Sequence, residues 1–265
     1  MTDGRIVVVM PAYNEAAGIG GFLVEISHHL SSRAEHLEII VADDRSSDST
    51  ASVVDAVAGA RVVTQRHNRG HGPTALAAYR AGLEAGADLI VHVDGDGQFS
   101  GHDIGRAVDA AQRTGVDVVH GVRRHRADPW YRRALTACLR AAVAVTTGRA
   151  IPDINTPLRV YRPEALEILI DAVGPDAEVP HVHFSLAESR GGFSVRYIEV
   201  ASLPRRGGIE AGTMWGAAAS LFPPKRLRRF VGRALAELWT ASLRPGARMR
   251  SVTRRPATAS SPSVP

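Results

Sequence analysis

The sequence predicts an α/β fold with a mostly parallel central sheet flanked by helices. Short apolar runs of strand length occur at residues 5–10, 37–42, 61–64 and 89–93, and stretches of helical character separate them. Each run ends in a turn of polar, glycine or acidic residues. This alternation is typical of parallel sheets, because parallel strands need a long crossover connection. The 265 residues, 45% of them hydrophobic, suffice for one domain with a sizeable core.

The first three strands lead into turns that carry polar side chains. Residues 5–10 are an apolar run, and a helix-like stretch follows to about Leu30. The run at 37–42 ends in an acidic, serine-rich turn whose last residues could cap the next helix. The short run at 61–64 leads to a turn with two glycines, and we expect a further helix from about Pro73.

The fourth apolar run ends in two carboxylates and an amide at alternating positions, Asp94, Asp96 and Gln98. Mg²⁺ and Mn²⁺ prefer oxygen ligands and commonly take one or two protein carboxylates, leaving other positions to water and substrate phosphates. Open α/β sheets bind ligands at the carboxyl ends of their strands. The pattern indicates a divalent metal site, although Asp-Gly-Asp-Gly is also ordinary turn chemistry. A calcium loop is excluded, because its sixth and twelfth positions need Gly and Glu and are Phe99 and Gly105 here.

Five arginines fall within eleven residues after a further strand expected at residues 116–120. A guanidinium group offers a planar fork that binds phosphate oxygens in pairs. The choice of arginine carries limited information here, because Lys225 is the only lysine among 32 basic residues. The alternatives are therefore a phosphate site that includes Arg123 and a solvated basic face.

Four motifs follow the strands in the order and spacing of family-2 glycosyltransferases. They are Pro11-Ala12-Tyr13-Asn14-Glu15, Asp43-Asp44-Arg45-Ser46-Ser47-Asp48-Ser49-Thr50, Asn68-Arg69-Gly70-His71-Gly72 and Asp94-Gly95-Asp96-Gly97-Gln98. Together they most resemble the polyprenol-phosphate, dolichol-phosphate mannose synthase-like branch, and the similarity weakens after about residue 165. The resemblance implies the GT-A nucleotide-diphospho-sugar transferase fold, a divalent metal, and transfer of a sugar with inversion.

The resemblance also implies roles for individual residues. Nucleotide-sugar binding would fall to Pro11, Tyr13, Glu15, Asp43, Asp44, Asp94, Asp96 and Arg206. The metal, Mg²⁺ or Mn²⁺, would be held by Asp94, Asp96 and Gln98. The expected catalytic residues are Asp96, Arg123 and Arg132. The acceptor side would include Arg133, Asp153 and Arg159.

A loop that begins at Pro204 resembles the family segment whose arginine closes over the phosphates. Residues 209–212 replace the Ser and Lys that usually follow its glycine, so either Arg205 or Arg206 could serve in this loop. Asp48 in the second motif is interpreted as a helix cap rather than a ligand.

The acceptor is indicated by what the motifs lack. A sugar hydroxyl must lose its proton as it attacks and so needs a general base, whereas a lipid phosphate is already anionic. No clear Glu-Asp motif supplies such a base, which favours polyprenyl phosphate and leaves Glu178 as the reserve candidate. His181 and His183 alternate as residues that line one face of a strand or cap a groove do, and we favour these interpretations over a metal site.

Cysteine content and hydropathy bear on the compartment. The single cysteine, Cys138, excludes an internal disulfide framework and suits a reducing cytoplasm. The first strand leaves no room for a signal peptide, and no apolar run reaches transmembrane length. We expect a cytoplasmic protein without a membrane anchor of its own, peripheral at the inner face of the cell membrane.

Basic charge is concentrated near the C-terminus, where residues 201–265 hold twelve basic and two acidic residues. We expect a catalytic domain at 1–212, a basic amphipathic helical extension at 213–250 and a disordered tail at 251–265. The extension has apolar residues at helical spacing, namely Leu227, Phe230, Val231, Ala234, Leu235, Leu238 and Trp239. This helix could lie on an anionic membrane surface or dock on the catalytic domain. A helix at 131–146 is a second candidate for the lipid side.

The favoured function is metal-dependent transfer of a hexosyl unit from a GDP- or UDP-sugar to a polyprenyl phosphate. The alternative is a soluble glycosyltransferase that acts on a hydroxyl of a cell-envelope or secondary-metabolite acceptor. A dinucleotide-binding oxidoreductase is disfavoured, because its glycine fingerprint belongs after the first strand, where Pro11 to Glu15 stand. A nucleic-acid-binding module is disfavoured because an aromatic content of 5% offers few stacking platforms, so we expect no nucleic-acid partner.

Overall fold

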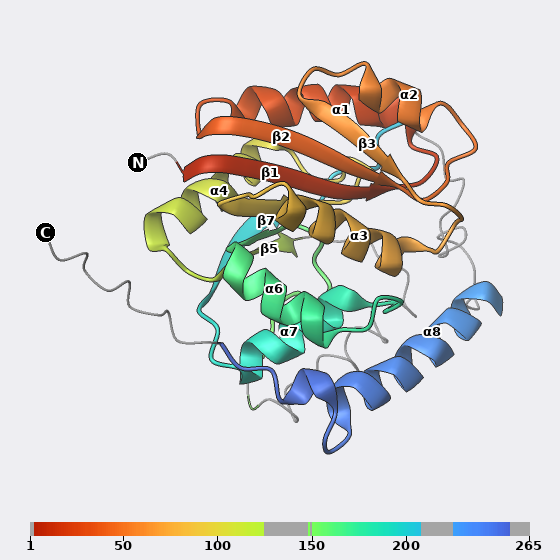
Figure 1. The fold of residues 1–265 in the computed structure, drawn as a ribbon, viewed down its shortest axis with the longest axis vertical. Coiled ribbons are helices and arrows are strands. Elements are labelled where there is room, and N and C mark those ends of the chain that lie inside the picture. Colours follow the sequence, from red (N-terminus) through yellow and green to blue (C-terminus); the bar gives the residue numbers. More distant parts are fainter. Residues whose placement is uncertain (1–2, 125–147, 149, 208–224, 255–265) are drawn as a thin grey trace, which may run out of the picture.

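The computed structural model describes residues 3–124, 148, 150–207 and 225–254. A seven-stranded sheet lies between layers of helices, and the C-terminal helix runs along the edge of the molecule (Figure 1). The strands are β1 (Asp3–Ala12), β2 (Ala34–Asp43), β3 (Ala60–Thr64), β4 (Leu89–His92), β5 (Val118–Arg124), β6 (Arg159–Tyr161) and β7 (Val195–Ala201). The helices are α1 (Ala16–Leu30), α2 (Thr50–Asp55), α3 (His71–Glu84), α4 (Gly101–Thr114), α6 (Pro163–Ala172), α7 (Pro180–Arg190) and α8 (Lys225–Leu238), followed by the π-helical turn η1 (Trp239–Leu243) and the 3₁₀ turn η2 (Arg248–Arg250).

The sheet has the strand order β3-β2-β1-β4-β6-β5-β7. Only β6 runs antiparallel to its neighbours β4 and β5, so the predicted mostly parallel sheet is confirmed. All five expected strands are present. The sequence analysis missed β6, which at three residues is too short to show a period, and β7, which lies at the edge of the sheet.

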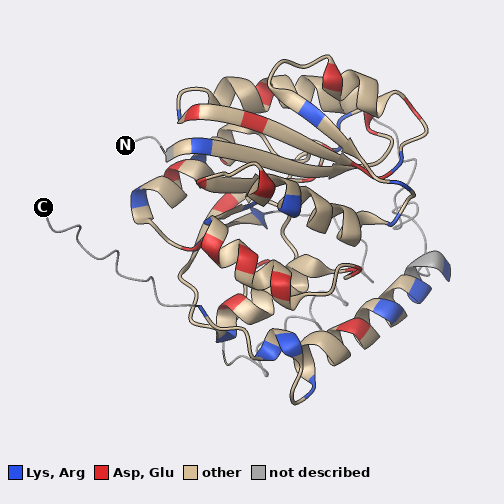
Figure 2. Cartoon of the chain, viewed as in Figure 1, with Lys and Arg blue, Asp and Glu red and all other residues tan. Residues whose placement is uncertain are grey.

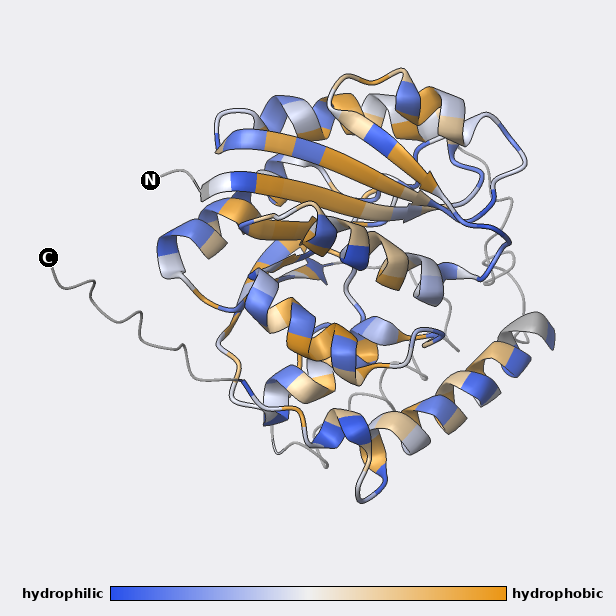
Figure 3. Ribbon diagram, in the orientation of Figure 1, coloured by the Kyte–Doolittle hydropathy of each residue, from blue (hydrophilic) through white to orange (hydrophobic). Residues whose placement is uncertain are grey.

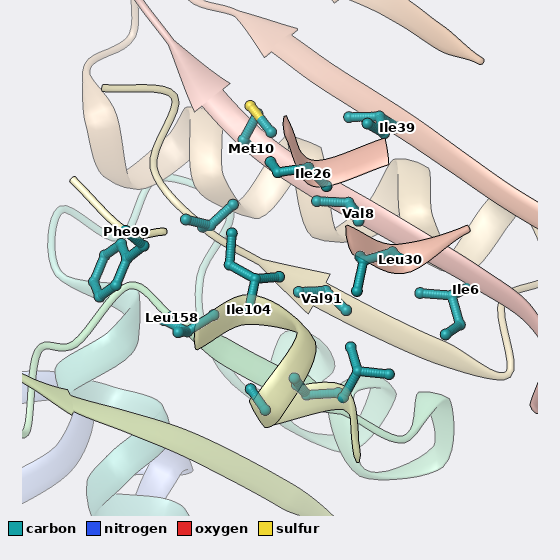
Figure 4. Packing of buried hydrophobic residues seen from close by; sticks show 14 of the residues in the cluster. Ile6, Val8, Met10, Ile26, Leu30, Ile39, Val91, Phe99, Ile104 and Leu158 are labelled. Atoms are coloured by element: carbon teal, nitrogen blue, oxygen red, sulfur yellow. The ribbon is translucent and has the colours of Figure 1, made fainter. Parts of the chain in front are cut away.

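Each face of the sheet buries its own apolar cluster. On one face, Val8 and Met10 of β1 belong to a cluster with Ile26 of α1 and Ile104 of α4 (Figure 4). On the other face, alternate β1 residues join side chains of α3, α6 and α7, including Val7, Val9, Leu76, Leu166 and Phe184. Because β1 is covered on both faces, its sequence is a continuous apolar run rather than an alternating one (Figure 3).

Of the two interpretations offered for His181 and His183, the one that places them on a face of a strand is wrong. The segment forms α7, in which Pro180 occupies the first turn, where a missing N–H leaves no hydrogen bond unmade. Residues Pro180 to Glu188 are all buried. A helix that is covered on every side has no apolar stripe, so its sequence lacks the helical period that would have identified it.

The helix expected in the basic extension is present as α8. Its last residue, Leu238, is buried in a small cluster with Ile151 and Val182, whereas Leu235 and Trp239 are exposed. The second lipid-side candidate, at residues 131–146, lies outside the described residues. None of the helices within the described ranges is long and apolar enough to cross a membrane.

The expected disordered tail is wrong at its start. Val252 is buried in the cluster beneath α7, and the Arg254 N–H donates a 2.9 Å hydrogen bond to the Gly191 carbonyl. The Arg254 guanidinium also pairs with Asp117 at 2.8 Å. Residues 251–254 therefore pack on the catalytic domain, and residues 255–265 lie outside the part of the chain that the structure describes.

Candidate active site

Parallel pairing brings three of the sequence motifs to one edge of the sheet. Ala12 at the end of β1 is in register with Asp43 at the end of β2, and Val9 is in register with His92 of β4. The turns that follow these strands therefore lie side by side. This edge therefore collects Tyr13, Glu15, Asp43, Asp94 and Asp96, and charged segments lie at this end of the strands in Figure 2.

The first turn presents one exposed aromatic ring and one buried carboxylate. Pro11 is buried within β1, Tyr13 is 40% exposed and Glu15 is 8% exposed. The Glu15 N–H donates to Thr50 Oγ1 at 2.9 Å, which ties this turn to the start of α2. Asp48 accepts hydrogen bonds from the N–H groups of Thr50 and Ala16, the first residues of α2 and α1, so it stabilises both helix starts from a position just outside the N-cap of α2, Ser49.

The second turn holds two buried aspartates with separate tasks. Asp43 accepts hydrogen bonds from the Ser46 N–H and hydroxyl groups. Asp44 accepts from the Arg69 N–H at 2.7 Å and the Gly70 N–H at 2.8 Å. Both Asp44 oxygens therefore receive backbone donors of Asn68-Arg69-Gly70-His71-Gly72, so Asp44 shapes the loop before α3, whereas Asp43 shapes its own turn.

The turn after β4, which holds Asp94 and Asp96, concentrates negative charge. Burial and repulsion by Asp94 raise the pKa of Asp96 to about 6. Burial, opposed by Arg205, and repulsion by Asp96 and Asp94 raise the pKa of Glu15 to about 7. Ionisation of Glu15 and Asp96 is therefore unfavourable in this partly buried region, and a bound cation would favour it.

The residues present fit a divalent cation. Asp94 Oδ1 is buried and accepts no hydrogen bond within the described structure. A buried carboxylate oxygen without a donor is costly, and a metal ion would satisfy it. No group of three or more His, Cys, Asp or Glu side chains suited to a metal occurs among the described residues. A cation that binds together with a diphosphate commonly uses only one or two carboxylates, and Asp94 and Asp96 form such a pair.

Gln98, the third predicted metal ligand, contacts a different loop. Its side-chain nitrogen donates to the Leu203 carbonyl at 3.3 Å, and its backbone carbonyl accepts from the Leu203 N–H at 2.9 Å. The Arg206 N–H donates to the Asp96 carbonyl at 3.0 Å. These bonds fasten residues 203–206 against the acidic turn, and the role of Gln98 as a ligand stays a prediction.

The two arginines of this loop point in different directions. The Arg205 guanidinium pairs with Glu15 and offsets part of the rise in the pKa of Glu15. Its charge also offsets part of the rise in the pKa of Asp96. Arg206 instead pairs with Glu25 of α1 and lies over the Phe22 ring, 5.0 Å from its centroid. The Arg206 side chain crosses Gly97 of the acidic turn, where its Nε donates to the Gly97 carbonyl at 3.3 Å, and its guanidinium ends at Glu25. Arg205 thus pairs with a carboxylate of the cluster, and which of the two arginines acts on the phosphates stays a prediction.

His71 faces the acidic turn, and the sequence analysis did not single it out as a candidate. It begins α3, and its Nε2 lies 3.6 Å from Asp94 Oδ1. A Cβ at the next position, Gly72, would come within 2.6 Å of the Glu178 carbonyl oxygen, so α3 and the start of α7 approach closely there. His71 belongs to the third motif, but its residue type alone gave no sign that it would face the acidic turn.

Arg123 and Asp153 meet at the same edge of the sheet. The Arg123 Nε donates to Asp153 Oδ2 at 2.7 Å and its Nη2 donates to Asp153 Oδ1 at 3.0 Å. Nη2 also donates to the Asn155 carbonyl. This two-pronged pair, with both side chains about nine-tenths buried, fixes the plane of the guanidinium. The other predicted arginines of this region, Arg132 and Arg133, lie outside the described residues.

Arg159 is fully buried, which the prediction of an acceptor-side residue did not anticipate. Its guanidinium donates to the carbonyl oxygens of Ile154, Thr156 and His181 and to the hydroxyl groups of Tyr161 and Ser185. Glu188 Oε1 lies 3.5 Å from its Nη1. Arg159 therefore organises the chain that carries Asp153, and it presents no surface to a substrate in this structure.

A group of neutral histidines lies beside Arg159 and predicts acid lability. Burial and nearby cations lower the pKa of His181 well below its usual value of 6.5. Below pH 6.5 the unfolded chain binds a proton at His181 that the folded protein does not bind. The free energy of unfolding should therefore decrease by about 1.4 kcal/mol for each unit by which the pH is lowered, for this group. Urea unfolding at pH 7, 6 and 5 measures the slope. His181→Gln should show a shallower slope, and equal slopes in both proteins would contradict this assignment.

Comparison with known families and proteins gives consistent matches. The family model described as Glycosyl transferase family 2 matches residues 7–169. The undecaprenyl-phosphate 4-deoxy-4-formamido-L-arabinose transferase of Aeromonas hydrophila is 33% identical over 174 residues, which cover 64% of this chain and 52% of that protein. The protein of the same description from Edwardsiella ictaluri is 30% identical over 198 residues, covering 73% and 60%. The chain thus spans between half and two thirds of the length of these relatives.

A solved structure of similar fold is glucosyl-3-phosphoglycerate synthase from Mycobacterium tuberculosis in complex with Mn²⁺, UDP-glucose and glycerol 3-phosphate. The TM-score is 0.62 and the identity is 20%, and the match covers 89% of this chain and 79% of that one. The complex of the same enzyme with Mn²⁺, UDP and glucosyl-3-phosphoglycerate has a TM-score of 0.60. At this level of identity the likeness concerns the fold.

Proposed function

This chain belongs to glycosyl transferase family 2 and has the GT-A fold, and from that premise we propose that it transfers a hexosyl unit from a nucleotide sugar to a polyprenyl phosphate. The observation that carries the proposal is the cluster of Glu15, Asp94 and Asp96 with Arg205 at the carboxyl edge of the sheet. Two acidic residues for a cation and one arginine beside them suit a diphosphate leaving group.

The acceptor proposal rests on charge. The two relatives named above carry undecaprenyl phosphate in their descriptions, and a phosphate acceptor attacks without a general base. Glu178, the reserve base for a hydroxyl acceptor, is paired with Arg233 at 2.5 Å. This ion pair occupies one carboxylate oxygen of Glu178, which supports the lipid phosphate over the hydroxyl alternative. We propose that the enzyme acts as a peripheral protein at the cytoplasmic face of the membrane that holds its acceptor.

The donor proposal rests on the first two turns. Tyr13 offers an exposed ring beside the buried carboxylates of Glu15 and Asp43, which can accept hydrogen bonds from base N–H and ribose hydroxyl groups. A GDP- or UDP-sugar meets these requirements. The UDP-glucose and Mn²⁺ in the mycobacterial structure support a UDP-sugar as the first donor to test.

Asp94 and Asp96 would hold the divalent ion, Mg²⁺ or Mn²⁺. When bound, such an ion neutralises the charge that develops on a departing diphosphate. The chain's own residues bind and orient the reactants. Arg205 neutralises charge at the acidic turn, and Arg123, held by Asp153, presents a fixed guanidinium at the same edge for phosphate oxygens.

The direct test incubates the protein with Mg²⁺ or Mn²⁺, a short-chain polyprenyl phosphate and a panel of GDP- and UDP-sugars. We expect a metal-dependent, lipid-linked sugar that Asp96→Ala does not form. Hydrolysis of a donor without any lipid product would contradict the acceptor. Hydroxyl acceptors would then be tested with wild type and Glu178→Gln. If Glu178 is the general base, this variant should be inactive.

The different orientations of the two loop arginines predict different kinetic effects. Arg205→Lys should lower kcat/KM for the donor by about tenfold or more, because a charged hydrogen bond at the carboxylate cluster is lost. Arg206→Lys is the matched control, since the Arg206 guanidinium pairs with Glu25 of α1 rather than with a carboxylate of the cluster, and it should change kcat/KM by less than about threefold. Initial rates over a range of donor concentrations measure both values. Equal losses in the two variants would contradict the assignment of Arg205.

A further inference from the structure

Helix α8 combines basic and apolar side chains on a part of the chain that projects from the sheet domain. Lys225, Arg228, Arg229 and Arg233 are exposed along it (Figure 2). Leu235 is 51% exposed and Trp239, just after its end, is 58% exposed. In a helix these two residues lie four positions apart and therefore on the same side. Large exposed apolar side chains next to basic ones are typical of a surface that meets an interface.

The far end of α8 is attached firmly to the catalytic domain. Glu237 accepts a 2.8 Å hydrogen bond from the Glu178 N–H and lies 2.6 Å from His183 Nε2. His183 Nδ1 is also 2.6 Å from the Ser242 hydroxyl, whose backbone carbonyl accepts from Arg190. Leu238 is buried beside α7. The C-terminal end of α8 is therefore held in place by hydrogen bonds and by packing against α7.

This attachment lies beside the acidic turn. Arg233 pairs with Glu178, and the Glu178 carbonyl packs against Gly72. The neighbouring His71 reaches to within 3.6 Å of Asp94. A short series of contacts thus joins α8 to the carboxylates. A membrane surface bound by α8 would therefore lie next to the site.

We propose that α8 docks the enzyme on an anionic phospholipid bilayer, with Leu235 and Trp239 entering the interface and the arginines meeting lipid phosphates. Charge complementarity selects this occupant. The C-terminal 65 residues are strongly basic, whereas the remainder of the chain holds more acidic than basic residues, so an anionic surface attracts α8 and repels the rest. The inference rests on the proposed function in one respect, that the acceptor is itself a membrane lipid.

Co-sedimentation of the full chain with vesicles tests the docking without any substrate. Wild type should bind vesicles of 70% phosphatidylcholine and 30% phosphatidylglycerol at least about tenfold more tightly than pure phosphatidylcholine. The double variant Arg228→Glu/Arg229→Glu should lose about tenfold or more of that affinity. Leu235→Ser/Trp239→Ser, which leaves the charge unchanged, should also bind several-fold more weakly.

The matched control is Arg113→Glu/Arg196→Glu, which makes the same charge change at exposed positions on α4 and β7, away from α8 (Figure 1). It should bind within about twofold of wild type. A control that loses as much affinity as the α8 variant would overturn the proposal, because total charge would then explain binding. An apolar variant that binds like wild type would overturn it too. So would self-association through Leu235 and Trp239 without vesicle binding, which would identify a second copy as the occupant.

Transfer assays separate this inference from the proposed function. Arg228→Glu/Arg229→Glu should glycosylate a short-chain acceptor in detergent at the wild-type rate and lose about tenfold with a long-chain acceptor in the anionic vesicles. If wild type makes no product with either acceptor, the proposed function fails, and vesicle binding still decides the docking role. Equal rates for variant and wild type on vesicles would contradict docking by α8.

Discussion

Replacing Asp96 with asparagine should reduce sugar transfer by about 10²-fold or more. The amide keeps the shape of the side chain and removes the negative charge that a divalent ion and its diphosphate require. The Asp96 carboxyl is in the turn after β4, where Asp94 and Glu15 also contribute charge. Initial rates at saturating Mg²⁺ or Mn²⁺ measure the loss. The matched control is Asp171→Asn, which makes the same chemical change at an exposed position near the end of α6 and should leave the rate within about threefold of wild type.

The same substitution at Asp96 should not destabilise the protein. Burial and Asp94 raise the pKa of Asp96 to about 6, so the folded state disfavours the ionised form at neutral pH. Removing that charge relieves the repulsion, and the free energy of unfolding in EDTA should be equal to or higher than that of wild type. Urea unfolding at pH 7.5 measures it. An inactive variant that is also less stable would attribute the activity loss to misfolding, and a fully active one would exclude Asp96 from the site.

Replacing Arg159 with methionine should lower the free energy of unfolding by about 3–5 kcal/mol. The change leaves the buried Glu188 carboxylate without its guanidinium partner and leaves several buried carbonyl oxygens without donors. Urea or thermal unfolding measures the loss. Arg196→Met is the control, because Arg196 is exposed on β7 and its loss should cost within about 0.5 kcal/mol.

Two further variants keep this prediction testable if Arg159→Met does not fold. Arg159→Lys retains the charge but not the planar fork, so it should fold and still be destabilised. Arg159→Met combined with Glu188→Leu removes both charges and should recover part of the loss. A loss below about 1 kcal/mol in Arg159→Met would contradict the organising role assigned to this residue.

The Arg159 network also affects the site. Arg159 donates to the Ile154 and Thr156 carbonyl oxygens. Both residues lie between Asp153 and Pro157, and the Pro157 carbonyl contacts His92. Asp153 in turn holds Arg123. Arg159 is therefore a positioning residue, which acts on substrate only through the arrangement of this loop.

The sequence by itself determined the sheet and the acidic turns that follow its strands. Strands covered on both faces need continuous apolar residues, and tight turns need glycine and small polar residues. Both features can therefore be recognised from consecutive residues in the sequence. The register of β1, β2 and β4 follows from the same pattern, since a shift would expose the apolar side chains. The gathering of Glu15, Asp43, Asp94 and Asp96 at one edge could thus be predicted.

Only the tertiary structure decided which polar groups face that edge. Arg205 and Arg206 are adjacent and identical in type, yet one meets Glu15 and the other Glu25 of α1. Arg159 resembled a site residue but is buried. The histidines of α7 were misassigned to a strand, because a helix buried on all sides shows no period. These outcomes depend on contacts between residues far apart in the chain, and local residue patterns carry no record of such contacts.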